Sequence, residues 1–220
     1  MRRALLRKNA SGGGFAFGNA LDFDGVDDYL DIPYLSAIGD FTYSCWANYD
    51  TLNAIFISNS TTGVHFIRTT SSTQIQYRVN TSTYFTIPTL STGTWYHFMF
   101  TRSSGNGRVY VNGVESSSGS QAVGTINLAF NFMGKRSTGD FMDGKYDECA
   151  FWNGTVGTLT NAKDLYNSGA GALASDVIAS PTWYYRMNES GTDTIAVDSS
   201  GNGNDGTLTN FPASGMWVAH

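Results

Sequence analysis

The sequence predicts an all-β fold, an antiparallel sandwich of two sheets with one short helix. Apolar and polar residues alternate within short runs, as expected for strands with one buried face. Turn-forming residues separate these runs about every 8–12 residues, which is typical of sandwiches and barrels. Charged residues make up 14% of the 220 residues and aromatic residues another 14%, a composition that favours strands and tight turns over exposed helices.

The individual strands are recognisable as alternating or continuously apolar runs. Residues 41–49 and 74–79 alternate and predict half-buried strands, whereas residues 95–101 are apolar on both faces and predict a central strand. An Asn-Gly pair within residues 108–115 predicts a hairpin, because both residues tolerate the positive φ of a type I′ turn. Further strands are predicted at residues 64–68, 84–87, 126–133 and 146–152.

The chain length suits one large β domain or two small ones. Residues 159–167 form the predicted helix, because apolar residues recur there at helical spacing and Gly169 stands where a C-terminal stop belongs. Cys45 and Cys149 both lie in apolar, strand-like runs. We expect two buried free thiols, and a bridge between adjacent strands is the alternative.

The first 14 residues are predicted to form a flexible basic arm. Arg2, Arg3, Arg7 and Lys8 give this arm its charge, and Ser11-Gly12-Gly13-Gly14 provides a flexible link to the rest of the chain. We interpret the four basic residues as anchors to a partner protein. The alternative is a disordered terminus without a partner.

Net charge and hydropathy argue against several classes of protein. The net charge is −5 and no basic face is visible beyond the first eight residues, so we do not expect a nucleic-acid partner. No apolar run reaches the about 18 residues that would span a membrane, so we expect no membrane insertion. Ala4-Leu5-Leu6 is much shorter than the apolar core of about 7–15 residues in a signal peptide, so we expect no export signal.

Six segments form a series with a familiar order and spacing: Ala20 to Pro33, Phe41 to Trp46, Trp95 to Phe98, Val109 to Gly113, Asp143 to Glu148 and Leu165 to Gly169. The series resembles laminin G-like domains of the concanavalin A-like lectin/glucanase superfamily over residues 20–170. This resemblance implies an antiparallel two-sheet jelly-roll sandwich. It is specific for the fold and not for function, because the superfamily includes lectins, adhesion modules, glycosidases and virion parts.

The C-terminal part departs from the usual order of that family. Residues 183–189 and 198–208 resemble a segment that usually precedes the Phe-Asp-Gly motif at residues 23–25. We interpret residues 15–220 as a single sandwich that a permuted segment, residues 178–220, completes, since the termini of compact domains often lie close together. The alternative is that this tail begins a second, truncated unit.

Enzymatic chemistry finds little support in the sequence. Glycoside hydrolysis usually needs two carboxylates about 5–9.5 Å apart across the bond. The nearest candidates are Asp143, Asp147 and Glu148, but consecutive strand residues point to opposite faces, so Asp147 and Glu148 are expected to face apart. Neither a serine nucleophile motif nor a histidine pair with zinc spacing is present. We therefore expect a non-enzymatic protein with no catalytic residues.

The resemblance also implies a structural calcium ion at the rim of the sandwich. Calcium takes about six to eight oxygen ligands. Asp24 and Asp27 lie with Asp28 in a glycine-containing turn, and Asp147 occupies the acidic position of the family's late strand. We take Asp24, Asp27 and Asp147 as the metal candidates. The alternative is that these aspartates cap turns through their own backbone.

Sugar binding, the common task of the family, would use exposed aromatic rings beside Asn or Asp side chains. Five tryptophans are available, but most lie in alternating runs typical of a core, and Trp217 is the least constrained. The sequence therefore does not identify the carbohydrate-binding residues.

Together these observations favour a non-catalytic surface-display and carbohydrate-binding module. Because the fold resembles extracellular domains and no export signal is visible, we predict a structural virion protein of a bacteriophage: a capsid decoration, fibre or tail protein. We expect a homo-oligomer that contacts other virion or surface proteins through its arm, binds glycans and is located on a virion or an extracellular surface. The alternatives are a secreted or cell-surface lectin-like adhesion domain and, third, a glycoside hydrolase or lyase.

Overall fold

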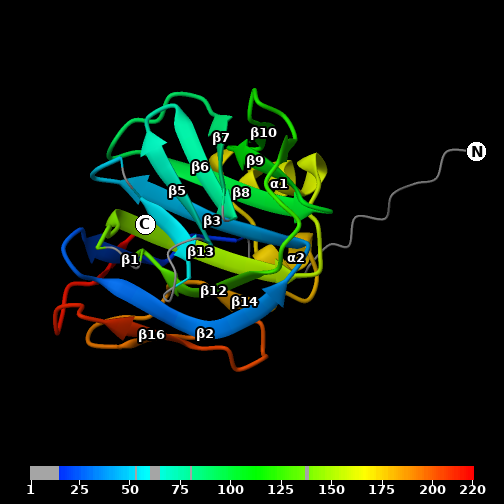
Figure 1. The fold of residues 1–220 in the computed structure, drawn as a ribbon. Helices are drawn as coiled ribbons and strands as arrows, with labels where there is room; N and C mark the ends of the chain where they lie inside the picture. Colours follow the sequence, from blue (N-terminus) through cyan, green and yellow to red (C-terminus); the bar gives the residue numbers. More distant parts are fainter. Residues whose placement is uncertain (1–14, 53, 60–64, 80, 137–138) are drawn as a thin grey trace, which may run out of the picture.

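The computed structural model describes residues 15–52, 54–59, 65–79, 81–136 and 139–220. These residues form two antiparallel sheets packed face to face, as the sequence predicts (Figure 1). The predicted arm with Arg2, Arg3, Arg7 and Lys8 lies outside the described residues, so its anchoring role stays a prediction.

The first sheet contains the predicted central strand, because residues 95–101 belong to β8 (Trp95–Ser103), which pairs with β3 (Phe41–Tyr49) on one side and with β9 (Asn106–Val111) on the other. β3 in turn lies between β8 and β13 (Asp143–Asn153). The predicted hairpin joins β9 and β10 through Asn112 and Gly113, whose φ angles are 50° and 73°. The order is β10 (Val114–Glu115), β9 (Asn106–Val111), β8, β3, β13, β1 (Asn19–Asp24) and β17 (Trp217–Ala219), with β11 (Gln121–Ala122) beside β9 and β14 (Trp183–Tyr185) beside β13.

The second sheet consists of strands whose apolar faces point toward the first. Its long strand β2 pairs with β12 on one side and with β16 on the other. The order is β15 (Ile195–Ala196), β16 (Gly206–Thr209), β2 (Tyr29–Ile38), β12 (Leu128–Met133), β4 (Ile55–Ser58), β5 (His65–Ser71), β6 (Gln74–Val79) and β7 (Thr81–Thr86).

The core between the sheets follows from the period-two alternation. Tyr43, Cys45 and Tyr49 of β3 are fully buried and belong to one apolar cluster with Phe56 of the opposite sheet. Because alternate residues of a strand share a face, these side chains meet across the space between the sheets. Cys45 and Cys149 are both buried and unbridged, which confirms the expectation of two free thiols.

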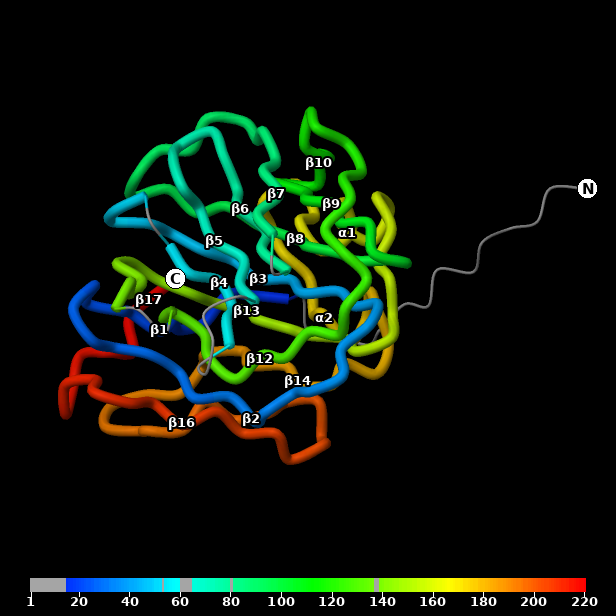
Figure 2. Tube along the Cα trace, viewed as in Figure 1, coloured from blue at the N-terminus to red at the C-terminus, as the bar shows by residue number. Residues whose placement is uncertain are grey.

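Residues 178–220 contribute strands to both sheets. β14 pairs with β13 and β17 pairs with β1 in the first sheet, and β16 pairs with β2 in the second. Figure 2 shows the orange-to-red end of the tube running beside the blue β2. These strands complete the sandwich, and their permuted origin stays a prediction.

Short helices cover the outer face of the first sheet. The predicted helix is α1 (Leu159–Tyr166), which begins with a capping box between Thr158 and Asn161. A 3₁₀ turn, η1 (Asn167–Gly169), and a one-turn helix, α2 (Ala174–Val177), follow it. Leu165 packs into a second apolar cluster with Trp152 of β13. Within the described residues, no helix has both the length and the apolarity to cross a membrane.

Candidate functional site

A pocket of about 360 Å³ opens at the rim of the sandwich, where β1 ends and β13 begins. Its walls carry an unusual concentration of acidic groups from segments far apart in the sequence. β1 and the turn after it, the end of β3 and the start of β13 each contribute. The carboxylates that line this pocket, called the rim pocket below, are Asp22, Asp24, Asp28, Asp50 and Asp143.

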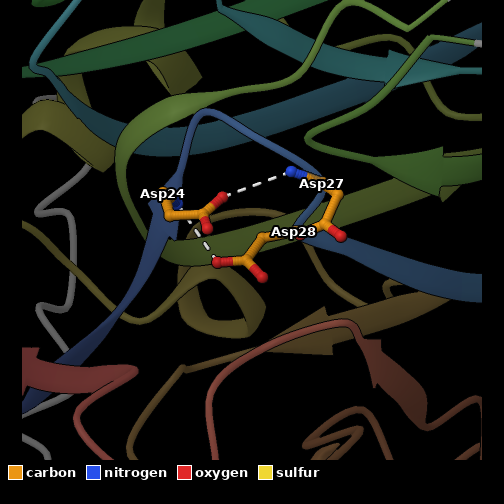
Figure 3. Close-up of side chains that lie close together, drawn as sticks. All are labelled: Asp24, Asp27 and Asp28. Carbon is orange, nitrogen blue, oxygen red and sulfur yellow. Dashed lines mark hydrogen bonds between the residues drawn. The ribbon is translucent and has the colours of Figure 1, made fainter.

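The turn after β1 positions three aspartates side by side (Figure 3). Asp24 Oδ1 accepts hydrogen bonds from the backbone amides of Val26 (2.8 Å) and Asp27 (3.3 Å), and Asp28 Oδ2 accepts one from the amide of Asp24 (3.1 Å). Gly25 is at φ +74°, and a Cβ there would lie 2.8 Å from the Cβ of Asp143. Aspartate and glycine at these positions therefore define the turn, as the turn-capping interpretation predicts.

Asp24, Asp27 and Asp28 can each direct one carboxylate oxygen to a common point. These three oxygens lie within 4.8 Å of one another. Asp28 is 1% exposed, and its Oδ1 has no hydrogen-bond partner. Burial raises the pKa of Asp28 to about 6, and the charges of Asp24 and Asp27 act in the same direction. A hard cation would relieve both the repulsion and the unpaired oxygen, so these residues fit the oxygen-only chemistry of calcium.

Asp28 is the residue that the sequence prediction did not retain as a ligand. It precedes Leu30 and Ile32 by two and four residues, and both of these point into the core. Because alternate residues of an extended strand share a face, this spacing indicates that the Asp28 side chain points inward.

Lys145 balances part of the acidic charge in the rim pocket. Its ammonium lies 3.4 Å from carboxylate oxygens of both Asp22 and Asp50. Burial nevertheless raises the pKa of Asp22, because it outweighs the effect of Lys145. The three turn aspartates form no ion pair within the described residues, where all 18 acidic residues of the chain lie.

Asp147 lies outside this group of oxygens, contrary to the predicted set of ligands. Asp24 pairs with Asp143 in the ladder, and Asp147 is four residues further along β13, about 13 Å away at the rise of an extended strand. Its Oδ2 lies 2.7 Å from Nδ1 of His220, and its Oδ1 accepts the amide of Glu148. Asp147 is therefore part of a separate buried cluster.

The expectation that Asp147 and Glu148 face opposite ways is wrong. A register shift between Asp147 and Ala150 interrupts the ladder with β3, and Glu148 adopts φ 47°. Such a bulge breaks the alternation of side chains. Both carboxylates therefore turn to the layer outside the first sheet, where Glu148 accepts hydrogen bonds from Tyr184 and Arg186. Burial raises the pKa of Glu148 to about 7.

Four of the five tryptophans are buried, and the partly buried fifth has one ring face covered by a histidine. Trp152 and Trp183 are fully buried, and Trp46 is 4% exposed. Trp217, expected to be the least constrained, is 9% exposed and donates a hydrogen bond from Nε1 to the carbonyl of Asp193 (2.8 Å). Trp95 stacks on His220 with ring centroids 3.9 Å apart.

This architecture defines a jelly-roll β-sandwich with an acidic pocket at its rim. The chain belongs to the concanavalin A-like lectin/glucanase superfamily, because the family model matches residues 24–162, more than half of its length. No curated protein sequence matches this chain.

Three solved structures illustrate the similarity. A candidate carbohydrate-binding protein from Bacteroides ovatus has a TM-score of 0.69 and 18% identity, covering 93% of this chain and 62% of that one, so this chain spans about 62% of its length. A heptameric SAP-like pentraxin from Limulus polyphemus has a TM-score of 0.55 and 14% identity, covering 68% and 82%. Domain 4 of an extracellular GH43 arabinanase from Geobacillus stearothermophilus, in complex with arabinotriose, has a TM-score of 0.55 and 22% identity, covering 71% and 82%. At these identities the similarity concerns the fold.

Proposed function

We propose that this chain is a non-catalytic carbohydrate-binding module that holds a calcium ion in its rim pocket. The observation that carries the proposal is the convergence of three aspartate oxygens within 4.8 Å, one from the buried Asp28, beside an open pocket. The similar arabinanase domain was solved with arabinotriose, and the similar Bacteroides ovatus protein is a candidate carbohydrate-binding protein.

In this proposal Asp24, Asp27 and Asp28 hold the ion. A bound calcium ion would supply positive charge and free coordination positions for sugar hydroxyls. Asp143 lines the same pocket and is available to accept hydrogen bonds from the sugar. Asn210 donates a hydrogen bond from Nδ2 to the carbonyl of Asp27 (3.1 Å) and so ties the C-terminal segment to the turn.

Glycan binding with and without calcium tests this function. We expect a neutral oligosaccharide, such as arabinotriose, to bind in calcium and to lose binding in EGTA. Asp24→Asn and Asp27→Asn should each abolish the calcium-dependent binding. Asp164→Asn is the matched control, because Asp164 is an exposed aspartate on α1 at the other face of the first sheet. Binding that is unchanged in EGTA would remove calcium from the proposal, and the absence of binding to every neutral glycan tested would remove the carbohydrate function.

We also propose that the module is displayed on a bacteriophage virion as a decoration, fibre or tail component. The charge distribution supports this. Four of the 13 basic residues precede residue 15, where there is no acidic residue, whereas residues 15–220 contain all 18 acidic residues. A basic segment joined to an acidic module suits attachment to an acidic partner surface. Deleting residues 1–14 should leave glycan binding intact and abolish association with purified particles. A chain that never associates with particles would contradict the virion role and favour a secreted or cell-surface adhesion domain.

A glycoside hydrolase is the second candidate, because a buried carboxyl with its pKa raised to about 6 suits a general acid. Asp28 takes this role in place of Asp147, which is fully buried behind His220. Against it, the turn oxygens lie within 4.8 Å, closer than the about 5–9.5 Å between the carboxylates of most glycosidases. Turnover of a polysaccharide that Asp28→Asn abolishes would establish this alternative.

A further inference from the structure

The outer face of the second sheet gathers four of the nine basic residues that follow residue 14. Arg68 belongs to β5 and Arg78 to β6, and Lys135 and Arg136 follow β12. The three guanidinium groups surround the ring of Phe66, at 5.5 Å for Arg68, 5.7 Å for Arg78 and 5.0 Å for Arg136. The sequence shows no basic face here, because the four residues come from three separate segments. We call these four residues the cationic face.

Positive charge exceeds negative charge on the cationic face. Asp140 pairs with Arg136 and with Arg68, whose Nη1 lies 3.2 Å from Asp140 Oδ2. Within the described residues, which include every acidic residue of the chain, Asp140 is the one carboxylate that pairs with these four cations. The Nε groups of Arg78 and Arg136 are buried without a hydrogen-bond partner. Burial and the charge of Arg136 lower the pKa of Arg68.

Lys135 continues the face along the sheet. Its ammonium lies 3.4 Å from the ring centroid of Tyr29 and 4.2 Å from that of Phe132. Phe132 of β12 and Phe66 of β5 both pair with Ser58 of β4, which lies between them. The two phenylalanine rings that contact cations therefore lie in one row across three strands. The spacing between strands, about 4.8 Å, places two cation–aromatic groups about 10 Å apart.

An exposed aromatic ring, Tyr84, adjoins these cations through the buried Gln76. Gln76 accepts a hydrogen bond from Arg68 Nε (2.7 Å) and donates from its amide to Ser82 Oγ (2.7 Å) and Tyr84 Oη (3.3 Å). Tyr84 is 48% exposed and is one of the few exposed aromatic rings among the described residues. Gln76 is buried, and both hydrogens of its amide are used within the protein, so it positions Tyr84 beside Arg68. The exposed ring of Tyr84 is the group that can stack on a sugar.

We propose that the cationic face, together with Tyr84, binds a polysaccharide that carries carboxylate or sulfate groups. Guanidinium groups pair with such anions through two parallel hydrogen bonds, and a chain of anionic sugars repeats its charge along a row of cations. Bound anions would offset the repulsion among the three arginines. The inference rests on the proposed carbohydrate-binding function and adds a ligand class and a second surface, distinct from the rim pocket.

Isothermal titration with polygalacturonate and with heparin tests the two anionic groups separately. Fully methyl-esterified polygalacturonate is the matched ligand control, because it keeps the sugar backbone and loses the charge. The variants are Arg78→Gln and Arg136→Gln. Arg108→Gln is the matched protein control, because Arg108 is an exposed arginine of β9 in the other sheet. Circular dichroism melts verify that each variant is folded, and Arg78→Lys retains the charge.

We expect at least one polyanion to bind, the methyl ester to bind at least about tenfold more weakly, and each glutamine variant to lose about tenfold in affinity, the loss of one charge-assisted contact. Arg108→Gln should retain the parent affinity. No binding of either polyanion, unchanged affinity in both glutamine variants, or equal binding of duplex DNA would overturn the proposal. Equal binding of the methyl ester would overturn the charge selectivity and leave the carbohydrate function standing. If the parent protein binds no neutral glycan, the carbohydrate function proposed for the rim pocket is rejected. Binding of polyanions to the cationic face is then still tested by the glutamine variants.

Discussion

Asp28→Asn is expected to stabilise the calcium-free protein at neutral pH. The Asp28 carboxylate is 1% exposed, and one of its oxygens has no hydrogen-bond partner. The other oxygen accepts the backbone amide of Asp24. An asparagine keeps that acceptor and removes a buried negative charge that has Asp24 and Asp27 as neighbours.

The raised pKa of Asp28 sets the size of this effect. Burial raises the pKa from 3.8 to about 6, so the folded protein binds the proton more tightly than the unfolded chain does. Ionisation of Asp28 therefore lowers stability as the pH rises from about 4 to about 6, with no further change above that range. The shift corresponds to about 3 kcal/mol at most. Solvent at the mouth of the pocket reduces it to about 1–2 kcal/mol, or about 2–8 °C in Tm for a chain of this size.

Thermal melts in EGTA, followed by circular dichroism, measure the difference. The variant should melt above the parent protein at neutral pH and together with it below a pH of about 4, where the Asp28 carboxyl is protonated in both folded and unfolded states. Added calcium should raise the Tm of the parent and leave that of the variant unchanged. A variant that melts below the parent at neutral pH in EGTA would refute the electrostatic reasoning.

Three further substitutions, two of them with a matched control, test the fold. Arg102→Met should lower the free energy of unfolding by at least about 3 kcal/mol in urea titrations. The buried guanidinium donates hydrogen bonds to four backbone carbonyls, which would lose their donor. A loss below about 1 kcal/mol would contradict this reasoning. Gly144→Ala should abolish stable folding, because a Cβ there would lie 2.2 Å from the carbonyl oxygen of Asn48, whereas Gly139→Ala, also at positive φ but in open space, should lower the Tm only slightly. Thr158→Ala should cost about 1 kcal/mol through loss of the α1 cap, and Thr158→Ser should restore it; equal melting of the two variants would exclude the cap.

The sandwich could be predicted from the sequence because alternation depends on local residues alone. In β3 the inward positions carry Tyr43, Cys45 and Tyr49, so the pattern identifies the face that points into the core. The prediction that only this face is buried is wrong, because distant segments also cover the outer face at Trp46. Asp28 follows the same alternation as Leu30 and Ile32, so its burial could have been predicted from the sequence. The helix at residues 159–167 was equally accessible, because its spacing and its stop signal are local.

Local reasoning fails where the ladder is irregular. Glu148 is a non-glycine residue at φ 47°, and residues 145–150 around it include no glycine that would indicate a bulge. The bulge turns Glu148 to the same layer as Asp147, where Tyr184 and Arg186 from a distant segment meet it. The predicted grouping of Asp147 with Asp24 failed for a related reason, because a distance along β13 depends on a register that only long-range pairing determines.

The cationic face depends on long-range pairing throughout. The β5–β6 register places Arg78 opposite Phe66, and the β4 pairings bring Lys135 and Arg136 to the same region after β12. The fold thereby places charges of opposite sign on different surfaces, with carboxylates at the rim pocket and guanidinium groups on the second sheet. The net charge of −5 does not show this separation. An acidic polysaccharide would be repelled by the rim pocket and attracted to the cationic face. Salt should therefore weaken polyanion binding steeply, because screening removes the charge–charge attraction on which that binding depends. Calcium-dependent binding of a neutral glycan should respond much less, because no charge attracts that sugar to the pocket.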